Sequence, residues 1–373
     1  MDALMLPSNW QRVRLGDIGK PCMCKRVMKH QTTRYGEIPF YKIGTFGNTA
    51  DAFISKKLFL EYKTKYSFPK KGDILISASG TIGRAVIYNG KPAYFQDSNI
   101  VWIDNDETLV KNDFLFYAYS NVKWNTEHTT ILRLYNDNFR NTLIPLPPLN
   151  EQIAIANILS DVDRYLYSLR ALILKKEGVK KALSFELLSQ RKRLKGFNQA
   201  WQRVRLGDIA NYLTSNLSAE QITQQGKIKV YDVNSFIGYT NTTFISDKPY
   251  ISIVKDGSVG RVRILPPKTN ILSTMGALVA NHKTTTEFLF YLLSNFDFKN
   301  FTSGSIIPHI YFKDYKEKTI FLPPLNEQIA IANILSDLDN EIISLKNKKR
   351  QFENIKKALN HDLMSAKIRV LKK

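Results

Sequence analysis

The sequence predicts an α+β fold with an internal duplication: two mixed α/β domains and two long helices that pair as a coiled coil. Two exact repeats predict the duplication. The segment W-Q-R-V-R-L-G-D-I at residues 10–18 returns intact at residues 201–209, and the segment L-P-P-L-N-E-Q-I-A-I-A-N-I-L-S-D at residues 146–161 returns intact at residues 322–337. Two long identical segments in the same order indicate duplication rather than chance.

Weaker matches lie between these anchors in the same order. The matched segments are residues 53–55 with 244–246, residues 80–84 with 257–261, and residues 114–117 with 288–291. The spacing changes between Ser55 and Gly80, so the first half carries an insertion of about 14 residues there.

Each half begins with a mixed segment. In the first half, short apolar runs punctuated by glycine and proline predict strands at residues 73–78, 84–88 and 99–103. The G-x-x-G at residues 80–83 has no lysine of a phosphate-binding loop, and we expect it to form the turn between the first two strands. Phenylalanine and tyrosine at helical spacing predict a short helix at residues 113–122 that packs into the core.

A long helical pattern follows each mixed segment. Asn150, just after Pro147 and Pro148, is expected to cap the first of these helices. Apolar residues at alternating spacings of four and three predict a pairing seam. The expected pairing residues are Ile155, Leu159, Val162, Leu166, Leu169 and Ile173 in the first helix and Ile331, Leu335, Leu338, Ile342, Leu345 and Phe352 in the second.

About 40 residues at ~1.5 Å per residue predict helices of roughly 60 Å. Gly178 costs the first helix about 1 kcal/mol relative to alanine, which favours a local bend there. A plain packing or dimerisation pair is one interpretation of these helices. We favour a spacer of fixed length between two similar modules, because the modules are duplicated together with the helices.

The composition indicates a folded, strongly basic protein. Its 54 Lys+Arg against 33 Asp+Glu give a net charge of +21, which makes nucleic acid the first candidate partner. Hydrophobic residues at 43% exclude wholesale disorder. The chain shows no membrane span and no signal peptide, so we expect a cytoplasmic protein.

Nothing in the sequence indicates catalysis. Cys22 and Cys24 form a lone C-x-C without a second ligand cluster, and the five histidines are scattered, so we expect reduced thiols and no metal site. No P-loop is present, and no paired acid and base groups or nucleophile stand out. These absences do not by themselves exclude an enzyme, but nothing in the residues calls for catalysis or a cofactor in this chain, and we expect neither.

In combination, these motifs resemble the specificity subunit of a type I restriction–modification enzyme. The resemblance spans essentially the whole chain. It includes the W-x-x-V-R-L-G-D-I opening of each half, the K-K-G-D-I-L-I-S-A-S-G-T-I-G-R segment at residues 70–84, and the P-L-P-P-L-N-E-Q start of the first long helix. The segment at residues 70–84 is only weakly similar to residues 252–261, because the second half lacks the Lys-Gly-Asp that precedes the strand in the first half.

The resemblance implies two target-recognition domains separated by two long antiparallel coiled-coil helices, with pseudo-two-fold symmetry. The expected boundaries are residues 1–149 for the first domain, 150–195 for the first helix, 196–325 for the second domain and 326–373 for the second helix. Each domain would read one half of a bipartite double-stranded DNA target. The helices would set the gap and help to recruit two methyltransferase subunits and, for cleavage, restriction subunits. S-adenosylmethionine and ATP would belong to those partners.

The duplication offers a rule for sorting DNA contacts. Residues shared by both halves suit scaffold or phosphate contact, and exposed polar residues that differ at matched positions suit base reading. Arg84 and Arg261 are candidates for phosphate contact, with a surface ion pair as the alternative. Arg133 aligns with His309, a difference typical of unlike base preferences, although a loop residue facing water is a close alternative.

A third difference sets the basic stretch of Lys25-Arg26 and Lys29-His30 against Asn216 to Gln221 in the other half. The expected DNA-binding residues are Lys25, Arg26, Lys29, Ser79, Thr81, Arg84, Thr129, Thr130, Arg133, Lys255, Ser258, Arg261, Ser305 and His309.

Three other functions fit the same sequence less well. A decoy or adaptor built like a specificity subunit would sequester methyltransferase subunits. A purely structural coiled-coil adaptor for an acidic protein would bind DNA weakly and without sequence preference. An unrecognised enzyme would show turnover without any partner.

Overall fold

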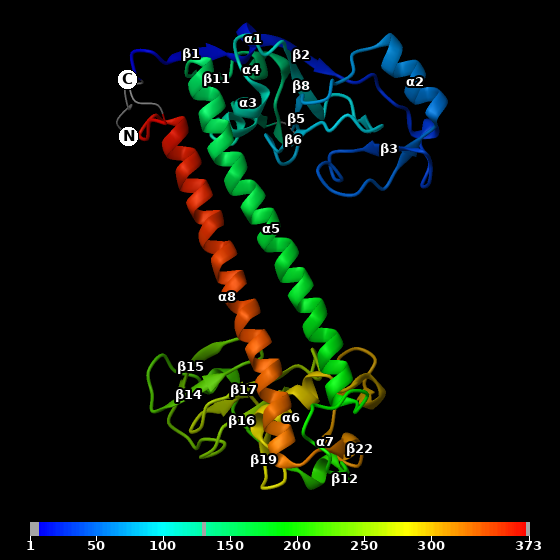
Figure 1. The fold of residues 1–373 in the computed structure, drawn as a ribbon, viewed down its shortest axis with the longest axis vertical. Helices are drawn as coiled ribbons and strands as arrows, with labels where there is room; N and C mark the ends of the chain where they lie inside the picture. Colours follow the sequence, from blue (N-terminus) through cyan, green and yellow to red (C-terminus); the bar gives the residue numbers. More distant parts are fainter. Residues whose placement is uncertain (1–6, 129–131, 371–373) are drawn as a thin grey trace. The chain divides into compact units, whose positions relative to one another are not determined.

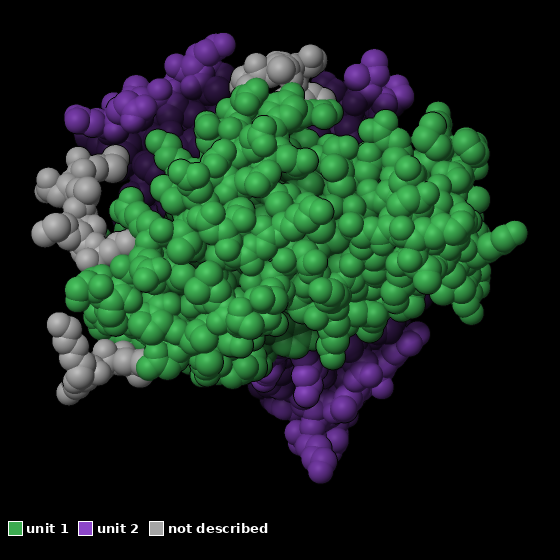
Figure 2. All heavy atoms as spheres, turned by 90° about the horizontal axis from the view of Figure 1, so that it is seen from above, with its two compact units in different colours: residues 1–169, 348–373 green, residues 170–347 purple. Residues whose placement is uncertain are grey.

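The computed structural model describes residues 7–128 and 132–370. Two compact units divide the chain: unit 1 comprises residues 1–169 and 348–373, and unit 2 comprises residues 170–347 (Figure 2). The boundaries fall inside the two long helices, α5 (Leu149–Leu188) and α8 (Leu325–Met364) (Figure 1). Each unit therefore consists of one globular domain and a part of each long helix.

Unit 1 is built on a four-stranded antiparallel sheet in the order β2-β8-β5-β6. A second sheet has the order β4-β3-β7, and β1 pairs with β11 and β9 with β10. The strands are β1 (Gln11–Arg14), β2 (Gly19–Met23), β3 (Ile38–Tyr41), β4 (Phe53–Ile54), β5 (Ile74–Ser77), β6 (Ala85–Ile87), β7 (Tyr94–Phe95), β8 (Ile100–Asn105), β9 (Glu127–His128), β10 (Leu132–Arg133) and β11 (Leu143–Leu146). The short helices are α1 (Leu15–Ile18), α2 (Lys56–Lys65), α3 (Asn112–Tyr119), α4 (Asn136–Arg140) and a 3-10 turn (Lys29–Gln31).

Unit 2 repeats this topology strand for strand. Its four-stranded sheet has the order β13-β19-β16-β17, its second sheet has the order β15-β14-β18, and β12 pairs with β22 and β20 with β21. The strands are β12 (Gln202–Arg205), β13 (Ala210–Thr214), β14 (Ile228–Tyr231), β15 (Phe236–Thr240), β16 (Tyr250–Val254), β17 (Val262–Leu265), β18 (Asn270–Ile271), β19 (Met275–Ala280), β20 (Thr302–Ser303), β21 (His309–Ile310) and β22 (Thr319–Leu322). The short helices are α6 (Thr286–Ser294), α7 (Phe312–Tyr315) and 3-10 turns at Leu206–Asp208, Ala219–Gln221 and Lys299–Phe301.

The expected fold of two repeated mixed domains and two long helices is therefore confirmed. The three strands expected in the first half correspond to β5, β6 and β8, within one or two residues at each end. The G-x-x-G forms the turn between β5 and β6, as expected. Gly83 has a φ of +80°, and a Cβ there would lie 2.1 Å from the indole nitrogen of Trp124, so only glycine fits.

The insertion in the first half forms most of α2. Ser55 begins this helix by accepting a hydrogen bond from the amide of Leu58 at 3.2 Å. Phe59 is the buried anchor of α2, in the same core cluster as Tyr94 and Trp102. Unit 2 passes from β15 to β16 without a helix at this place.

The short aromatic helix packs into the core, as predicted. In α3, Phe114, Leu115 and Tyr119 are almost completely buried. They lie in a core cluster with Ile155 and Leu159 from the start of α5 and Leu363 from the end of α8. In unit 2, α6 packs in the same way against the start of α8 and the end of α5. The ends of the long helices are therefore part of each domain's core.

The first long helix begins one residue before its expected cap. The carbonyl oxygen of Pro148 accepts from the amides of Glu151 and Gln152, both at 2.9 Å, so Leu149 is already helical. Asn150 still satisfies one free amide, because its side chain accepts from Glu151 at 3.0 Å. The helix assignment of α5 is continuous through Gly178.

Within unit 1, the two long helices run antiparallel. Asp163 of α5 accepts from Tyr117 at 2.9 Å and pairs with Lys356 of α8 at 2.6 Å, and the rings of Tyr165 and Phe352 lie 4.6 Å apart. The pKa of the Tyr117 phenol is raised by its burial and by its bond to Asp163, so it remains a donor.

Unit 2 repeats this arrangement with the roles of the helices exchanged. Asp339 of α8 accepts from Tyr291 at 3.0 Å and pairs with Lys180 of α5 at 2.5 Å. Lys176 pairs with Glu341 at 2.8 Å. Lys176 and Lys180 of α5 therefore each form an ion pair with α8.

The two exact repeats contact each other inside each unit. In unit 2, the buried Glu327 of the N-E-Q segment accepts from the indole nitrogen of Trp201 at 3.0 Å and from Arg193 at 2.7 Å. In unit 1, Glu151 accepts from Trp10 at 3.0 Å and from Arg369 at 2.7 Å. The arginine that follows the end of each long helix thus binds the glutamate at the start of the other helix.

Other features of the described residues bear on function. Within residues 7–128 and 132–370, no helix combines the length and apolar character needed to cross a membrane. Burial raises the pKa of the free Cys24 thiol to about 12, which keeps it protonated and unreactive.

Candidate nucleic-acid interface

Arg133 and His309 occupy the same place in the two units. Arg133 forms a β-bridge with Ser79, and His309 forms one with Asp256. The flanking backbone bonds match as well. Gly80 donates to Leu132 in unit 1 as Gly257 donates to Pro308 in unit 2. The alignment predicted from the sequence is therefore a structural equivalence, in which a shared backbone presents different side chains.

In unit 1, Arg133 lines a hollow of about 520 Å³ together with Arg26 and Lys29, two more of the expected DNA-binding residues. Lys42 adds a fourth cation, and Asp97 is the single carboxylate of the lining. Arg26 pairs with Asp97 at 2.8 Å while keeping 68% of its side chain exposed. The structure thus brings Arg133, from a distant part of the sequence, into one basic hollow with Arg26 and Lys29.

Unit 2 has a hollow of about 330 Å³ at related positions, and its chemistry differs. Asn216, Leu217 and Gln221 line it, on the segment that matches Arg26 and Lys29. Every lining residue is uncharged. The full lining is Leu213, Thr214, Ser215, Asn216, Leu217, Gln221, Thr242, Thr243, Phe244, Ile245 and Asn270. The hollow of unit 1 is therefore basic, and the hollow of unit 2 is uncharged.

Arg84 and Arg261 each follow the second glycine of a G-x-x-G turn and are exposed. Gly83 and Gly260 both have a φ of +80°, so the two turns share their backbone shape. Nη1 of Arg84 donates to the carbonyl of Phe46 at 3.0 Å, which ties the guanidinium to the loop between β3 and β4. The remaining donors of Arg84 can meet an anion, as a phosphate contact requires.

The other expected residues fall into three groups. Thr81, Ser258 and Ser305 are exposed, Lys255 is half-buried, and Lys25 is exposed with its ammonium 5.0 Å from the centre of the Tyr66 ring. Ser79 is buried and donates to Asn99 at 2.6 Å, so its hydroxyl is not presented to a ligand. Thr129 and Thr130 lie outside the described residues.

The sequence reasoning missed several residues of the site. The basic hollow is also lined by Lys42, Asp97, Ser98 and Asn99. These residues were missed because they are separated in the sequence from Arg26 and Arg133. A weak signal was available for Asp256. Asp256 aligns with Ser79, so a charged residue in the second half replaces a neutral one in the first half. Its neighbour in the structure, His309, was already a candidate for base reading.

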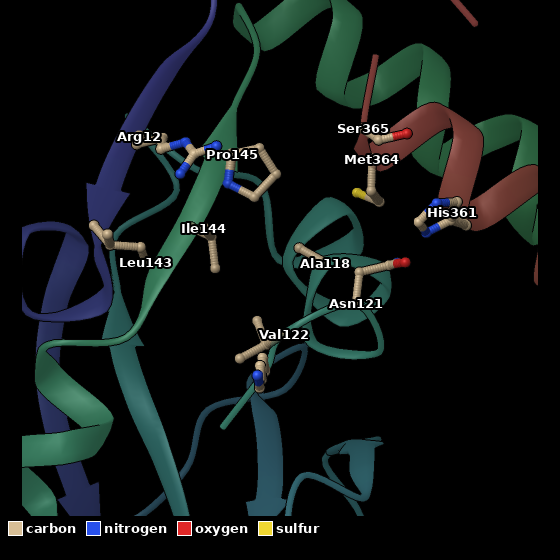
Figure 3. Close-up of a pocket in the computed structure, with 11 residues that line it drawn as sticks. Arg12, Ala118, Asn121, Val122, Leu143, Ile144, Pro145, His361, Met364 and Ser365 are labelled. Atoms are coloured by element: carbon tan, nitrogen blue, oxygen red, sulfur yellow. The ribbon is translucent and has the colours of Figure 1, made fainter. Parts of the chain in front are cut away.

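A third hollow, of about 290 Å³, lies in unit 1 between the end of α3, strand β11 and the end of α8 (Figure 3). Its lining includes Ala118, Val122 and Pro145, where the matched positions of unit 2 carry the larger Leu292, Phe296 and Phe321. This hollow contains none of the expected DNA-binding residues.

Comparisons with known proteins agree with this architecture. The family model described as the type I restriction modification DNA specificity domain matches residues 7–176 and 198–354. A Haemophilus influenzae protein named as a type I restriction enzyme specificity subunit is 63% identical over 148 residues, which cover 39% of this chain and only 38% of that protein. A Methanocaldococcus jannaschii protein named as the type I restriction enzyme MjaX specificity subunit is 27% identical over 411 residues. The match covers 98% of this chain and 95% of that protein.

A solved structure shares the fold. The crystal structure of a type I restriction–modification system S subunit from M. genitalium superposes with a TM-score of 0.64 at 20% identity. The match covers 97% of this chain and 98% of that one.

Proposed function

Because the chain belongs to the type I restriction modification DNA specificity family, we propose that it reads a bipartite DNA sequence, with one domain for each half-site. The observation that carries this proposal is the pair of matched surfaces. At one equivalent place unit 1 carries Arg133 and unit 2 carries His309. The hollow that Arg133 shares with Arg26 and Lys29 is basic, whereas the hollow of unit 2 that Asn216 and Gln221 line is uncharged. Arginine and lysine suit guanine and phosphates, whereas neutral polar side chains suit other base edges, so the two half-sites differ in sequence.

The domain and helix boundaries expected from the sequence are part of this proposal. Residues 1–149 and 196–325 act as the two target-recognition domains, and residues 150–195 and 326–373 act as the helices that set the gap between the half-sites. The antiparallel ion pairs within each unit support this role, because they tie α5 to α8.

The same duplication supports two docking places for methyltransferase subunits. Each unit exposes one copy of a matched apolar set on its parts of the long helices, although such residues are usually buried. The set is Leu149, Ile153, Tyr167 and Ile355 in unit 1 and Leu325, Ile329, Ile343 and Val179 in unit 2. Two equivalent surfaces suit two copies of one partner.

In this proposal the chain itself is not catalytic. The methyltransferase subunits bind S-adenosylmethionine and transfer the methyl group, and restriction subunits join the complex for ATP-dependent cleavage. The assembly works on chromosomal DNA in the cytoplasm. The net charge of +21 lowers the electrostatic cost of holding a large complex on a polyanion.

A selection experiment tests the proposal. The chain is purified with its methyltransferase subunits and exposed to a library of random duplexes, and the methylated duplexes are sequenced. We expect two short defined blocks separated by a gap of fixed length without sequence preference. Recovery of one uninterrupted site, or of no sequence preference, would show that the two domains do not act as separate readers.

Replacing Arg84 with alanine is expected to weaken binding to all duplexes equally. Loss of one phosphate contact lowers the slope of log affinity against log salt by about one unit. Binding isotherms at several salt concentrations, on a target duplex and an unrelated duplex, measure both effects. Arg261→Ala is the matched substitution in unit 2. An unchanged slope, or a loss restricted to particular bases, contradicts a phosphate contact.

A further inference from the structure

We propose that Asp256 and His309 form a base-reading pair in unit 2, in which Asp256 positions His309 so that its Nε2 accepts a hydrogen bond from an amino-bearing base. The proposal rests on the bipartite reading described above. It identifies the atom that reads one position of the second half-site and the class of base that it selects, adenine or cytosine.

The first step is the geometry of the pair. Nδ1 of His309 lies 2.7 Å from Oδ1 of Asp256. An ionised carboxylate only accepts hydrogen bonds, so the proton of the neutral imidazole is on Nδ1. This assignment leaves Nε2 as an acceptor without a proton. Asp256 therefore determines which atom of the ring can meet a ligand.

The second step is the orientation of the ring. The ring of Tyr311 lies at 20° to that of His309, with 6.5 Å between the ring centres. Gly304 has a φ of +90°, and a Cβ there would lie 2.3 Å from the carbonyl oxygen of Ile307 and 3.0 Å from Cδ2 of His309, so glycine lets the backbone and the imidazole approach this closely. The histidine side chain is still 36% exposed. The ring is thus held by its neighbours while remaining accessible.

The third step is the comparison with unit 1. Ser79, at the place of Asp256, donates to Asn99 and does not hold Arg133. Arg133 presents the forked donors that match O6 and N7 of guanine in the major groove. A single acceptor at Nε2 cannot serve guanine in this way, but it matches the N6 amino group of adenine or the N4 amino group of cytosine. The two units therefore read opposite hydrogen-bonding patterns from the same place.

Reciprocal exchange of the pairs tests this inference. Unit 2 receives Asp256→Ser with His309→Arg, which installs the pair of unit 1 on a backbone that already accommodates it. The complex with methyltransferase subunits is then assayed on duplexes varied at each base of the second half-site. We expect one position to change its preference from adenine or cytosine to guanine by about tenfold to a hundredfold, with the first half-site unaffected. The reverse exchange, Ser79→Asp with Arg133→His, should alter only the first half-site.

Single substitutions separate positioning from plain stability. Asp256→Ala should reduce discrimination at that one position by about tenfold, while binding to unrelated DNA does not fall, because a negative charge facing the phosphates is removed. Asp256→Asn should restore it, because the amide oxygen can still accept from Nδ1. If Asp256→Ala instead weakens binding to all sequences equally, with no change in preference, the pair is structural and the inference is wrong.

The outcomes also distinguish this inference from the proposed function. A wild-type complex that has no split target overturns both. A split target whose second half keeps its base preference through the exchange and through the removal of Asp256 overturns the pair alone.

Discussion

Replacing Glu327 with alanine is expected to lower the free energy of unfolding of unit 2 by about 3–5 kcal/mol. The carboxylate is completely buried and accepts from Trp201 at 3.0 Å and from Arg193 at 2.7 Å. Its removal leaves the buried indole N–H without its acceptor. It also takes the carboxylate from a guanidinium that has 27% of its side chain exposed and keeps the carbonyl of Gln199 as an acceptor. Urea denaturation followed by tryptophan fluorescence measures the loss, because Trp201 lies at the site.

An exposed ion pair of the same unit provides the control. Glu317 pairs with Arg205 at 3.0 Å, with more than half of each side chain exposed, so Glu317→Ala should cost less than about 1 kcal/mol. Glu151→Ala repeats the test in unit 1, where Trp10 and Arg369 take the corresponding roles. If Glu327→Ala costs no more than Glu317→Ala, the buried contact does not stabilise the unit.

The duplication made most of the fold predictable. Exact repeats indicated two equal domains, and the apolar seam indicated two long helices, because both signals are local in the sequence. The contacts that the repeated segments make with each other were not predictable. Trp10 and Glu151 stand 141 residues apart, and nothing in either segment states that the indole donates to the carboxylate. A single sequence shows which residues are repeated, but it does not show which of the repeated residues contact one another.

The candidate site was predictable to a similar degree. The alignment of Arg133 with His309 followed from the repeat, and the β-bridges confirm that they are equivalent. The convergence of Arg26 and Arg133 on one hollow depends on loops folded around the sheets, which periodicity does not describe. The start of α5 was misplaced by one residue because the carbonyl of Pro148, a backbone group, provides the acceptors that a side-chain cap was expected to supply.

The length of the paired helices should determine the gap in the DNA target. Inserting one heptad after Leu169 in α5 and one after Asn347 in α8 lengthens both helices by ~10 Å, or about three base pairs. Both insertions fall at the boundaries between the units, so the contacts within each unit are kept. A heptad also preserves the apolar seam. We expect the lengthened chain to lose its original target and to methylate one in which the same two blocks lie about three base pairs further apart.

Single insertions show whether the two helices act together. A heptad in α5 alone shifts the ion pairs of one helix against the other, so it should abolish methylation of both the original and the lengthened target rather than change the gap. Sequencing of methylated library duplexes compares the three chains under identical conditions. If the double insertion leaves the gap unchanged, the distance between half-sites is set by the methyltransferase partners or by the DNA. Since each unit ties α5 to α8 through its own ion pairs, we expect the gap to follow the length of both helices.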